Sequence, residues 1–236
     1  MNKRTQQALL TAWMIGMATL LVGCSEPSDM SSPQAGFAGL GAEAEGYAQA
    51  SAETPLAFPD DHGPHPDYRI EWWYLTANLE DSVGQPLGLQ WTLFRQALMP
   101  PDERPAPIEW ASDQVWMAHM GLSKGGTHLA AERFARSHSE QSQGQAGVTA
   151  SPFQAWIDDW RFQSPASANF EHFTLSAYSG EGNERFGYAL TLLAKGPLVW
   201  HGDNGFNAKT VQGQGSHYYS QPYLQIEGSV TLNGEQ

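Results

Sequence analysis

The chain has 236 residues, of which 41% are hydrophobic and 16% are charged, and this balance excludes general disorder and allows a sizeable core. Its 25 Asp and Glu outnumber its 12 Lys and Arg, which gives a formal charge of −13. Because such a surface repels phosphate groups, we expect no nucleic-acid partner and no attraction to anionic lipid head groups. Attachment to a membrane would therefore require a covalent lipid or an apolar segment.

Residues 1–23 are typical of a secretory signal peptide. Lys3 and Arg4 precede an apolar stretch, residues 8–22, that is shorter than the roughly 20 residues needed to span a bilayer. The stretch ends in Leu21-Val22-Gly23-Cys24, which resembles the lipobox of bacterial lipoproteins, whose processing leaves an acylated cysteine at the new N-terminus. Cys24 is the one cysteine of the chain, so it can form no internal disulfide, and acylation would consume its thiol. An ordinary signal anchor with a chance cysteine is the alternative interpretation.

The residues behind Cys24 predict where the protein is held. Ser25 stands where an inner-membrane retention signal would usually be Asp, which favours the cell envelope, lipid-anchored at the outer membrane and facing the periplasm. Residues 24–57 are rich in Ser, Ala, Gly, Glu and Pro and have too few large apolar side chains to order themselves alone. We predict a flexible linker over 24–57, with its last turn docking on a folded domain over 58–236.

The folded domain is predicted to be all-β. From Tyr68 onward, aromatic and β-branched stretches alternate with turn signals about every ten residues, a spacing typical of a sandwich or barrel. The expected strands cover residues 69–79, 87–95, 115–122, 129–135, 153–162, 170–178, 186–193 and 223–232. No long stretch shows a 3.6-residue apolar period, so a helical bundle is disfavoured.

Tryptophans suggest what the interior of this domain holds. Eight of the nine tryptophans follow Cys24: Trp72, Trp73, Trp91, Trp110, Trp116, Trp156, Trp160 and Trp200. An antiparallel, lipocalin-like barrel of about eight strands can hold side chains or one small ligand. Trp72, Trp73, Trp91, Trp156 and Trp160 are the candidate ligand-binding residues, and a cavity that they line would suit flat or polyene-like apolar molecules. The alternative is that each tryptophan simply fills the core.

The end of the chain carries a turn signal with nothing after it. Asn233-Gly234 is the strongest two-residue hairpin signal, and only Glu235 and Gln236 follow. A returning strand is therefore expected in a longer protein, of which this chain would be a C-terminally truncated piece.

Three polar clusters are candidate sites. In the first, residues 58–65 precede Glu71, and three interpretations stay open: a zinc or iron site through His62, His65 and Glu71, acid–base chemistry, or a rigid hydrogen-bonded loop over the barrel mouth. The spacing fits no helix-borne or knuckle motif, so we expect no metal. In the second cluster, residues 198–205, His201 and Asp203 could share a proton or simply form a turn.

The third cluster, residues 216–222, places His217 and Tyr218 at the start of a strand. The sequence contains nothing that resembles a serine nucleophile elbow, a Walker loop or a dinucleotide fingerprint, and we expect no cofactor.

Taken together, the clusters resemble those of the AttH and hydroxyneurosporene synthase family, the carotenoid 1,2-hydratases, and of relatives labelled predicted secreted hydrolases. The segments that carry the resemblance are residues 58–65, 71–74, 91–95, 119–123, 132–136, 198–205 and 217–222, in this order. The resemblance implies two consecutive lipocalin-like barrels, of which this chain would contain the first and the start of the second.

The resemblance also implies a chemistry, the addition of water across an isoprenoid double bond. This reaction needs a carboxylic acid kept protonated by an apolar pocket and aromatic faces that stabilise a cation. The candidate catalytic groups are His217, Tyr218, Asp203, His201 and Glu71. The sequence thus indicates an exported lipoprotein that binds a hydrophobic isoprenoid- or acyl-like ligand and hydrates or hydrolyses it. Two rivals are a non-catalytic carrier with the same cavity and an accessory lipoprotein of an envelope transporter.

Overall fold

The computed structural model describes residues 45–104, 112–138, 144–211 and 213–235, which belong to one of its two units, Glu43–Gln236. The predicted signal peptide, the lipidation residue Cys24, most of the predicted linker and Trp110 lie outside the described residues. Within the described ranges, no helix has both the length and the apolar character that a membrane crossing requires.

The first sheet has four antiparallel strands in chain order, each paired with the next. The strands are β1 (Ile70–Glu80), β2 (Pro86–Ala97), β3 (Gln114–Lys124) and β4 (Thr127–Ser137). In β2 the period-2 pattern places Leu89, Trp91 and Leu93 on the inner face, where none of them is more than 4% exposed. The turn between β1 and β2 is held by the Asp81 carboxylate, which accepts hydrogen bonds from the backbone N–H groups of Val83 and Gln85.

The second sheet has six antiparallel strands in the order β14-β9-β8-β7-β6-β5. Its strands are β5 (Ala146–Ala150), β6 (Phe153–Ile157), β7 (Trp160–Ser164), β8 (His172–Ser179), β9 (Phe186–Ala194) and β14 (Leu224–Thr231). The prediction of one strand over 153–162 is wrong, because Asp158 has a positive φ of 53° and turns the chain into a hairpin. The turn pairs Ile157 with Trp160 on the same face, so the inward positions change from odd numbers in β6 to even numbers in β7.

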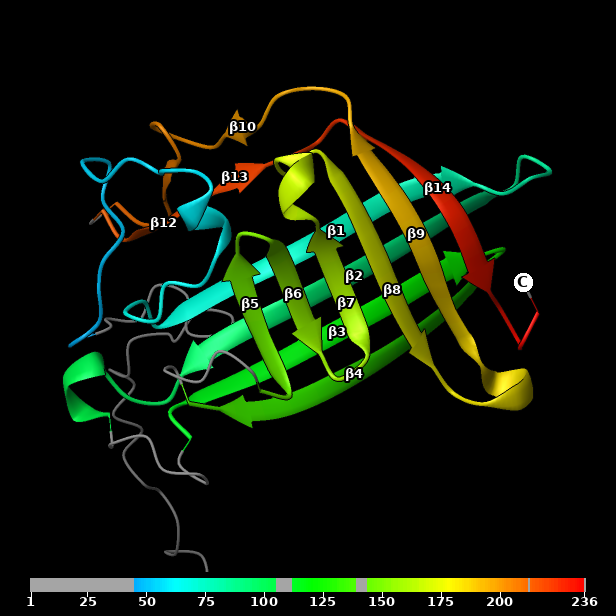
Figure 1. Ribbon diagram of the computed structural model, residues 1–236, viewed down its shortest axis with the longest axis horizontal. Coiled ribbons are helices and arrows are strands. Elements are labelled where there is room, and N and C mark those ends of the chain that lie inside the picture. The colour runs from blue at the N-terminus through cyan, green and yellow to red at the C-terminus, as the bar shows by residue number, and fades with distance from the viewer. Residues whose placement is uncertain (1–44, 105–111, 139–143, 212, 236) are drawn as a thin grey trace, which may run out of the picture. The chain divides into compact units, whose positions relative to one another are not determined.

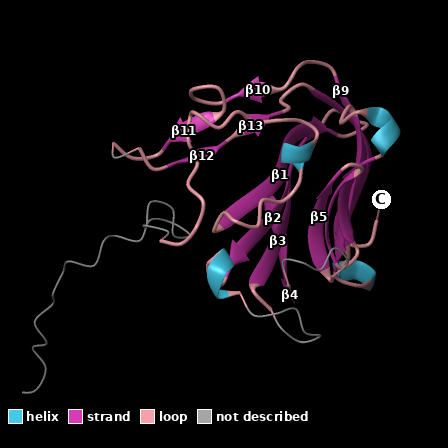
Figure 2. Cartoon of the chain, turned by 60° about the vertical axis from the view of Figure 1, so that its left-hand side comes forward, coloured by secondary structure: helices cyan, strands magenta, loops and turns pink. Residues whose placement is uncertain are grey.

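Two short ribbons and four 3-10 turns complete the described secondary structure. One ribbon pairs β10 (Val199–Trp200) with β13 (Tyr219–Ser220), and the other pairs β11 (Phe206–Ala208) with β12 (Gly215–His217). The 3-10 turns are η3 (Asp60–His62), η4 (Pro101–Glu103), η5 (Ala166–Ala168) and η6 (Gly182–Glu184). Figures 1 and 2 both show the ribbons gathered over one end of the sheets.

The core lies between the two large sheets, which Figure 2 shows face to face. The rings of Trp91 and Phe162, one from each sheet, pack edge to face with their centroids 5.8 Å apart. The buried hydroxyl of Tyr188 crosses the same interface and donates a hydrogen bond of 2.6 Å to the backbone carbonyl of Gln90. The prediction of an all-β, antiparallel fold is therefore confirmed.

Candidate functional site

A cavity of about 1140 Å³ is lined by the edge strand of each large sheet, β1 and β14. Its apolar wall includes four phenylalanines that belong to the second sheet or to the connection before β8: Phe153, Phe162, Phe170 and Phe173. Leu224 and Ile226 of β14 and most of β1 complete this wall. The volume exceeds the roughly 300–1,000 Å³ of typical small-molecule sites, so the cavity has room for a large apolar molecule.

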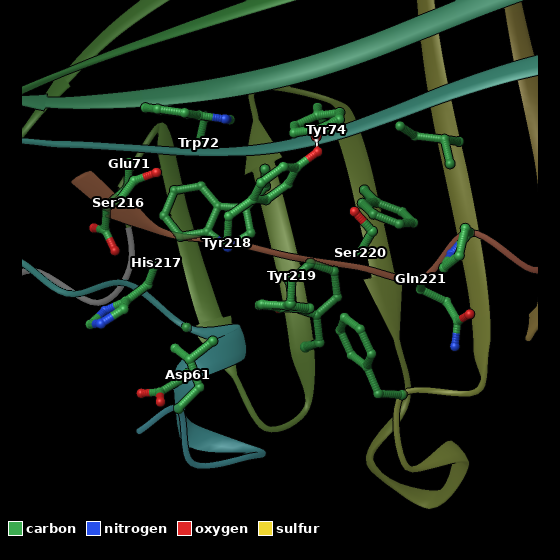
Figure 3. A pocket seen from close by; sticks show the side chains of 18 of the residues that line it. Asp61, Glu71, Trp72, Tyr74, Ser216, His217, Tyr218, Tyr219, Ser220 and Gln221 are labelled. Carbon is green, nitrogen blue, oxygen red and sulfur yellow. Dashed lines mark hydrogen bonds between the residues drawn. The ribbon is translucent and has the colours of Figure 1, made fainter. Parts of the chain in front are cut away.

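The polar side of the cavity comes from loops. Residues 215–222, which contain β12 and β13, run across the cavity and place Tyr218 next to Trp72 and Tyr74 of β1 (Figure 3). Residues 54–57, from the end of the predicted linker, line it as well. The described part of that linker is tied to the domain, since Ala48 N–H donates to the Asp67 carbonyl at 2.9 Å and His217 Nε2 donates to the Ser51 carbonyl at 3.0 Å.

A pair of phenols forms the first polar group of the cavity. The hydroxyls of Tyr74 and Tyr218 are hydrogen-bonded to each other, as the dashed line in Figure 3 marks. The His201 ring stacks on Tyr218 at 3.9 Å with an interplanar angle of 10°, and its Nε2 is 2.7 Å from the Ser220 hydroxyl. Burial, and then the hydrogen bond to Tyr218, raise the pKa of Tyr74 above its ordinary value. Tyr74 therefore remains a protonated hydrogen-bond donor at neutral pH.

A buried histidine forms the second polar group. His62 lies between two aromatic rings, with centroid distances of 4.3 Å to Phe58 and 3.5 Å to Phe170, and its Nδ1 is 2.8 Å from the Tyr219 hydroxyl. Burial lowers the pKa of His62 to about 4, so the imidazole is neutral at neutral pH. Burial also raises the pKa of Tyr219. This pair is therefore uncharged; Tyr219 lines the cavity, and His62 lies behind the lining, stacked on Phe170.

The third polar group is a network around Glu71. The Glu71 carboxylate accepts hydrogen bonds from Arg95 Nε at 2.7 Å, from His65 Nδ1 at 2.8 Å and from the His65 backbone N–H at 2.9 Å. His65 Nε2 also lies 2.9 Å from the Asp61 carboxylate. The hydrogen bond to Glu71 outweighs burial and raises the pKa of His65 to about 9, so the ring is an imidazolium at neutral pH.

This network shows how residues 58–65 are held to the strands. Both oxygens of Glu71 already accept hydrogen bonds, and Arg95 is fully buried against them. The arrangement ties the loop to β1 and β2 through Glu71 and Arg95. Over the ranges that the structure describes, no three His, Cys, Asp or Glu residues are placed to hold a metal ion.

The structure brings five of the predicted site residues to the cavity: Glu71, Trp72, Trp73, His217 and Tyr218. His201 reaches it indirectly, through its stacking on Tyr218. Asp203 does not line the cavity, because its backbone closes a tight turn with Phe206 and its exposed carboxylate accepts a hydrogen bond from Asn204 Nδ2.

The other three predicted ligand-binding tryptophans do not line the cavity: Trp91 and Trp160 lie in the core between the sheets, and Trp156 is buried on the other face of the second sheet, against Gly147. Trp91 and Trp160 have no exposed surface, and Trp156 is 8% exposed. Trp156 Nε1 donates to the Gly144 carbonyl at 3.0 Å, and Trp160 Nε1 donates to the Tyr178 carbonyl at 2.9 Å. Packing holds all three indoles, and hydrogen bonds hold two of them, whereas the buried Nε1 of Trp91 has no hydrogen-bond partner among the described residues.

Sequence reasoning missed several cavity residues. Tyr74 lies two positions after Trp72 on β1, and this spacing along a strand could have found it. The four wall phenylalanines were visible only as inward positions of expected strands. Lys209 carried no signal, because it reaches the cavity from the connection between the ribbon strands β11 and β12.

The fold and the cavity define an all-β protein with space for an apolar ligand between two antiparallel sheets. The family model described as AttH-like matches residues 49–236, and the chain belongs to this family. The crystal structure of a Nitrosomonas europaea protein with a provisional AttH designation is similar, with 33% sequence identity and a TM-score of 0.66 over 80% of this chain. The chain spans 53% of the length of that protein. No curated protein matches the chain.

Proposed function

We propose that this chain is an exported, lipid-anchored protein that binds a hydrophobic ligand, isoprenoid- or acyl-like, in the cavity between its two sheets. The observation that carries the proposal is the cavity of about 1140 Å³ with its phenylalanine wall. Burying apolar surface stabilises a complex by roughly 25 cal/mol per Å², so such a wall favours long or flat apolar molecules. The lipobox-like sequence before Cys24 supports the anchor.

Binding is better supported than hydration or hydrolysis. Protonation of an alkene requires a carboxylic acid that stays protonated in an apolar environment. The two carboxylates that line the cavity, Asp61 and Glu71, both contact the imidazolium of His65, and Glu71 also contacts Arg95. Both carboxylates are thus engaged by charged hydrogen-bond partners, and neither stands alone against the phenylalanine wall.

The test of binding uses the tryptophans that line the cavity. All-trans-retinol absorbs where tryptophan emits, so its binding beside Trp72 and Trp73 should quench fluorescence in a saturable way. The variant Ala77→Phe extends a lining side chain into the cavity and should weaken retinol binding at least tenfold. Ala130→Phe makes the same change at an exposed position of β4 and should leave binding unchanged. Linear, unsaturable quenching, or equal affinities in both variants, would refute the proposal.

The test of catalysis follows from the same preparation. The protein is incubated with lycopene-like polyenes and with long-chain acyl esters, and the products are analysed by mass spectrometry. Saturable binding without a mass gain of one water and without ester cleavage would leave the carrier function. A water adduct that disappears in Tyr218→Phe would establish hydration instead.

The test of the anchor needs the full chain expressed in a bacterial host. The wild type should fractionate with membranes and carry an acyl modification on Cys24, and Cys24→Ser should be soluble and unmodified. Recovery of both forms in the same fraction would contradict a lipid anchor.

A further inference from the structure

One charged residue of the cavity has no opposite charge beside it. Four charged side chains line the cavity: Asp61, His65, Glu71 and Lys209. The first three form ion pairs with one another and with Arg95. Across the ranges that the structure describes, no carboxylate lies within 4.0 Å of the Lys209 ammonium. The cavity of a strongly acidic protein therefore presents one uncompensated cation.

The phenol pair lies next to this cation. Lys209 Nζ is 5.9 Å from the centroid of the Tyr218 ring, whose hydroxyl is hydrogen-bonded to that of Tyr74. Within a pair of phenols one hydroxyl donates to the other, so the accepting phenol keeps its own proton free for a further hydrogen bond. The Lys209 ammonium over the Tyr218 ring and the free O–H of the phenol pair are both donors that suit a negatively charged oxygen.

The opposite wall of the cavity offers no such groups. Phe153, Phe162 and Phe173 line it, and each of these side chains is at most 8% exposed. A hydrocarbon without a head group would bury the wall but leave the ammonium and the free phenol O–H without an acceptor, which costs binding energy when water is displaced. A molecule with an apolar chain and an anionic oxygen at one end would satisfy both sides.

We propose that the ligand is a long-chain carboxylate, whose head group accepts hydrogen bonds from Lys209 and the Tyr74–Tyr218 pair while its chain lies against the phenylalanine wall. This inference rests on the proposed binding function and narrows the ligand class. It predicts that a carboxylate binds more tightly than the alcohol with the same chain.

The test compares all-trans-retinoic acid with all-trans-retinol, which share the same polyene chain, by tryptophan quenching at pH 7.5. The wild type should prefer the acid, and Lys209→Gln should weaken acid binding about three- to tenfold while leaving retinol binding unchanged. Lys209→Arg should keep the preference for the acid, and rising salt should reduce it. Lys195→Gln is the matched control, because Lys195 is exposed and lies outside the cavity lining.

A competition assay extends the test to simple chains. Palmitate should displace retinol from the wild type more effectively than hexadecanol, and Tyr218→Phe should reduce this difference about threefold.

Three outcomes are decisive. A preference for the acid that is lost in Lys209→Gln and kept in Lys195→Gln supports the inference. Equal binding of acid and alcohol, unaffected by Lys209→Gln, overturns the head-group assignment and leaves the proposed binding of an apolar ligand intact. Failure of every probe to bind overturns both.

Discussion

The substitution Glu71→Gln tests the network that ties residues 58–65 to β1 and β2. It keeps the shape of the side chain and removes the charge that faces Arg95 at 2.7 Å and His65 at 2.8 Å. The Arg95 side chain has no exposed surface and that of Glu71 is 13% exposed, so water cannot replace the lost carboxylate. We therefore expect a large loss of folding stability from a change of one functional group.

The magnitude follows from leaving a buried charge without its partner. Removing one member of a buried ion pair typically costs about 3–5 kcal/mol, compared with a total stability of about 5–15 kcal/mol for a domain. Replacing the pair with apolar groups avoids the stranded charge, so the double variant Glu71→Leu/Arg95→Met should lose less stability than Glu71→Gln alone. This comparison separates the stranded charge from the general disturbance of the site.

The assay is urea unfolding at pH 7, followed by tryptophan fluorescence and analysed by linear extrapolation. Glu80→Gln provides the control, because Glu80 is exposed at the end of the same strand. It should change the free energy of unfolding by less than about 0.5 kcal/mol. If Glu71→Gln costs no more than Glu80→Gln, the network does not hold the loop and the reasoning is wrong.

Four further outcomes are expected from the same unfolding assay. The pKa of His62 is lowered to about 4, so the unfolded chain binds this proton at a higher pH than the folded protein does. The free energy of unfolding should therefore fall as the pH drops from 6.5 towards 4, and His62→Phe should remove this decrease. The pKa of His65 is raised to about 9, so its contribution to the free energy of unfolding is complete below pH 6.5 and should be lost as the pH rises through 9. His65→Gln should remove this loss at high pH. Tyr188→Phe removes the hydrogen bond between the sheets and should cost about 1–2 kcal/mol. Gly147→Ala would place a methyl group 2.7 Å from the Trp156 ring and should cost about 1–3 kcal/mol, whereas Gly88→Ala meets nothing closer than 4.0 Å and should cost less.

Each of these outcomes can fail in a recognisable way. If the free energy of unfolding depends on pH in the same way after the histidine substitutions, other groups are responsible for that dependence. A Tyr188→Phe variant as stable as the wild type would show that the hydroxyl does not join the sheets. Equal stability of the two glycine variants would mean that the ring opposite Gly147 moves aside without cost.

The strands were predictable because burial between two sheets imposes a period of two on the sequence. Leu89, Trp91 and Leu93 follow this period and are buried as expected. The turn at Asp158 was missed because the segment was interpreted as one strand, although the inward positions change from odd to even numbers across the turn. The side chains of Asp158 and Asp159 were read as strand positions, although Asp is a common turn residue.

The cavity was predictable only in part, for a geometric reason. Trp73 and Trp91 stand at inward positions of their strands, but only Trp73 belongs to an edge strand and therefore borders open space. Alternation reports which face a side chain takes and not which strand lies at the edge of its sheet. The candidate residues of the loops depended on contacts between distant segments, such as that between Tyr74 and Tyr218, and local spacing contains no information on these.

The segment that leads towards Cys24 is also part of the cavity wall, since residues 54–57 line it and Ser51 accepts a hydrogen bond from His217. With the lipid on Cys24 as proposed, about 21 residues separate the anchor from the start of the described domain, and a fully extended chain of that length reaches about 75 Å at most. The linker to the lipid anchor and part of the cavity lining would then be the same segment of the chain. A ligand leaving the bilayer would then reach the cavity within the length of the linker. A chain that starts at residue 58 would lose the lining residues 54–57 together with the linker.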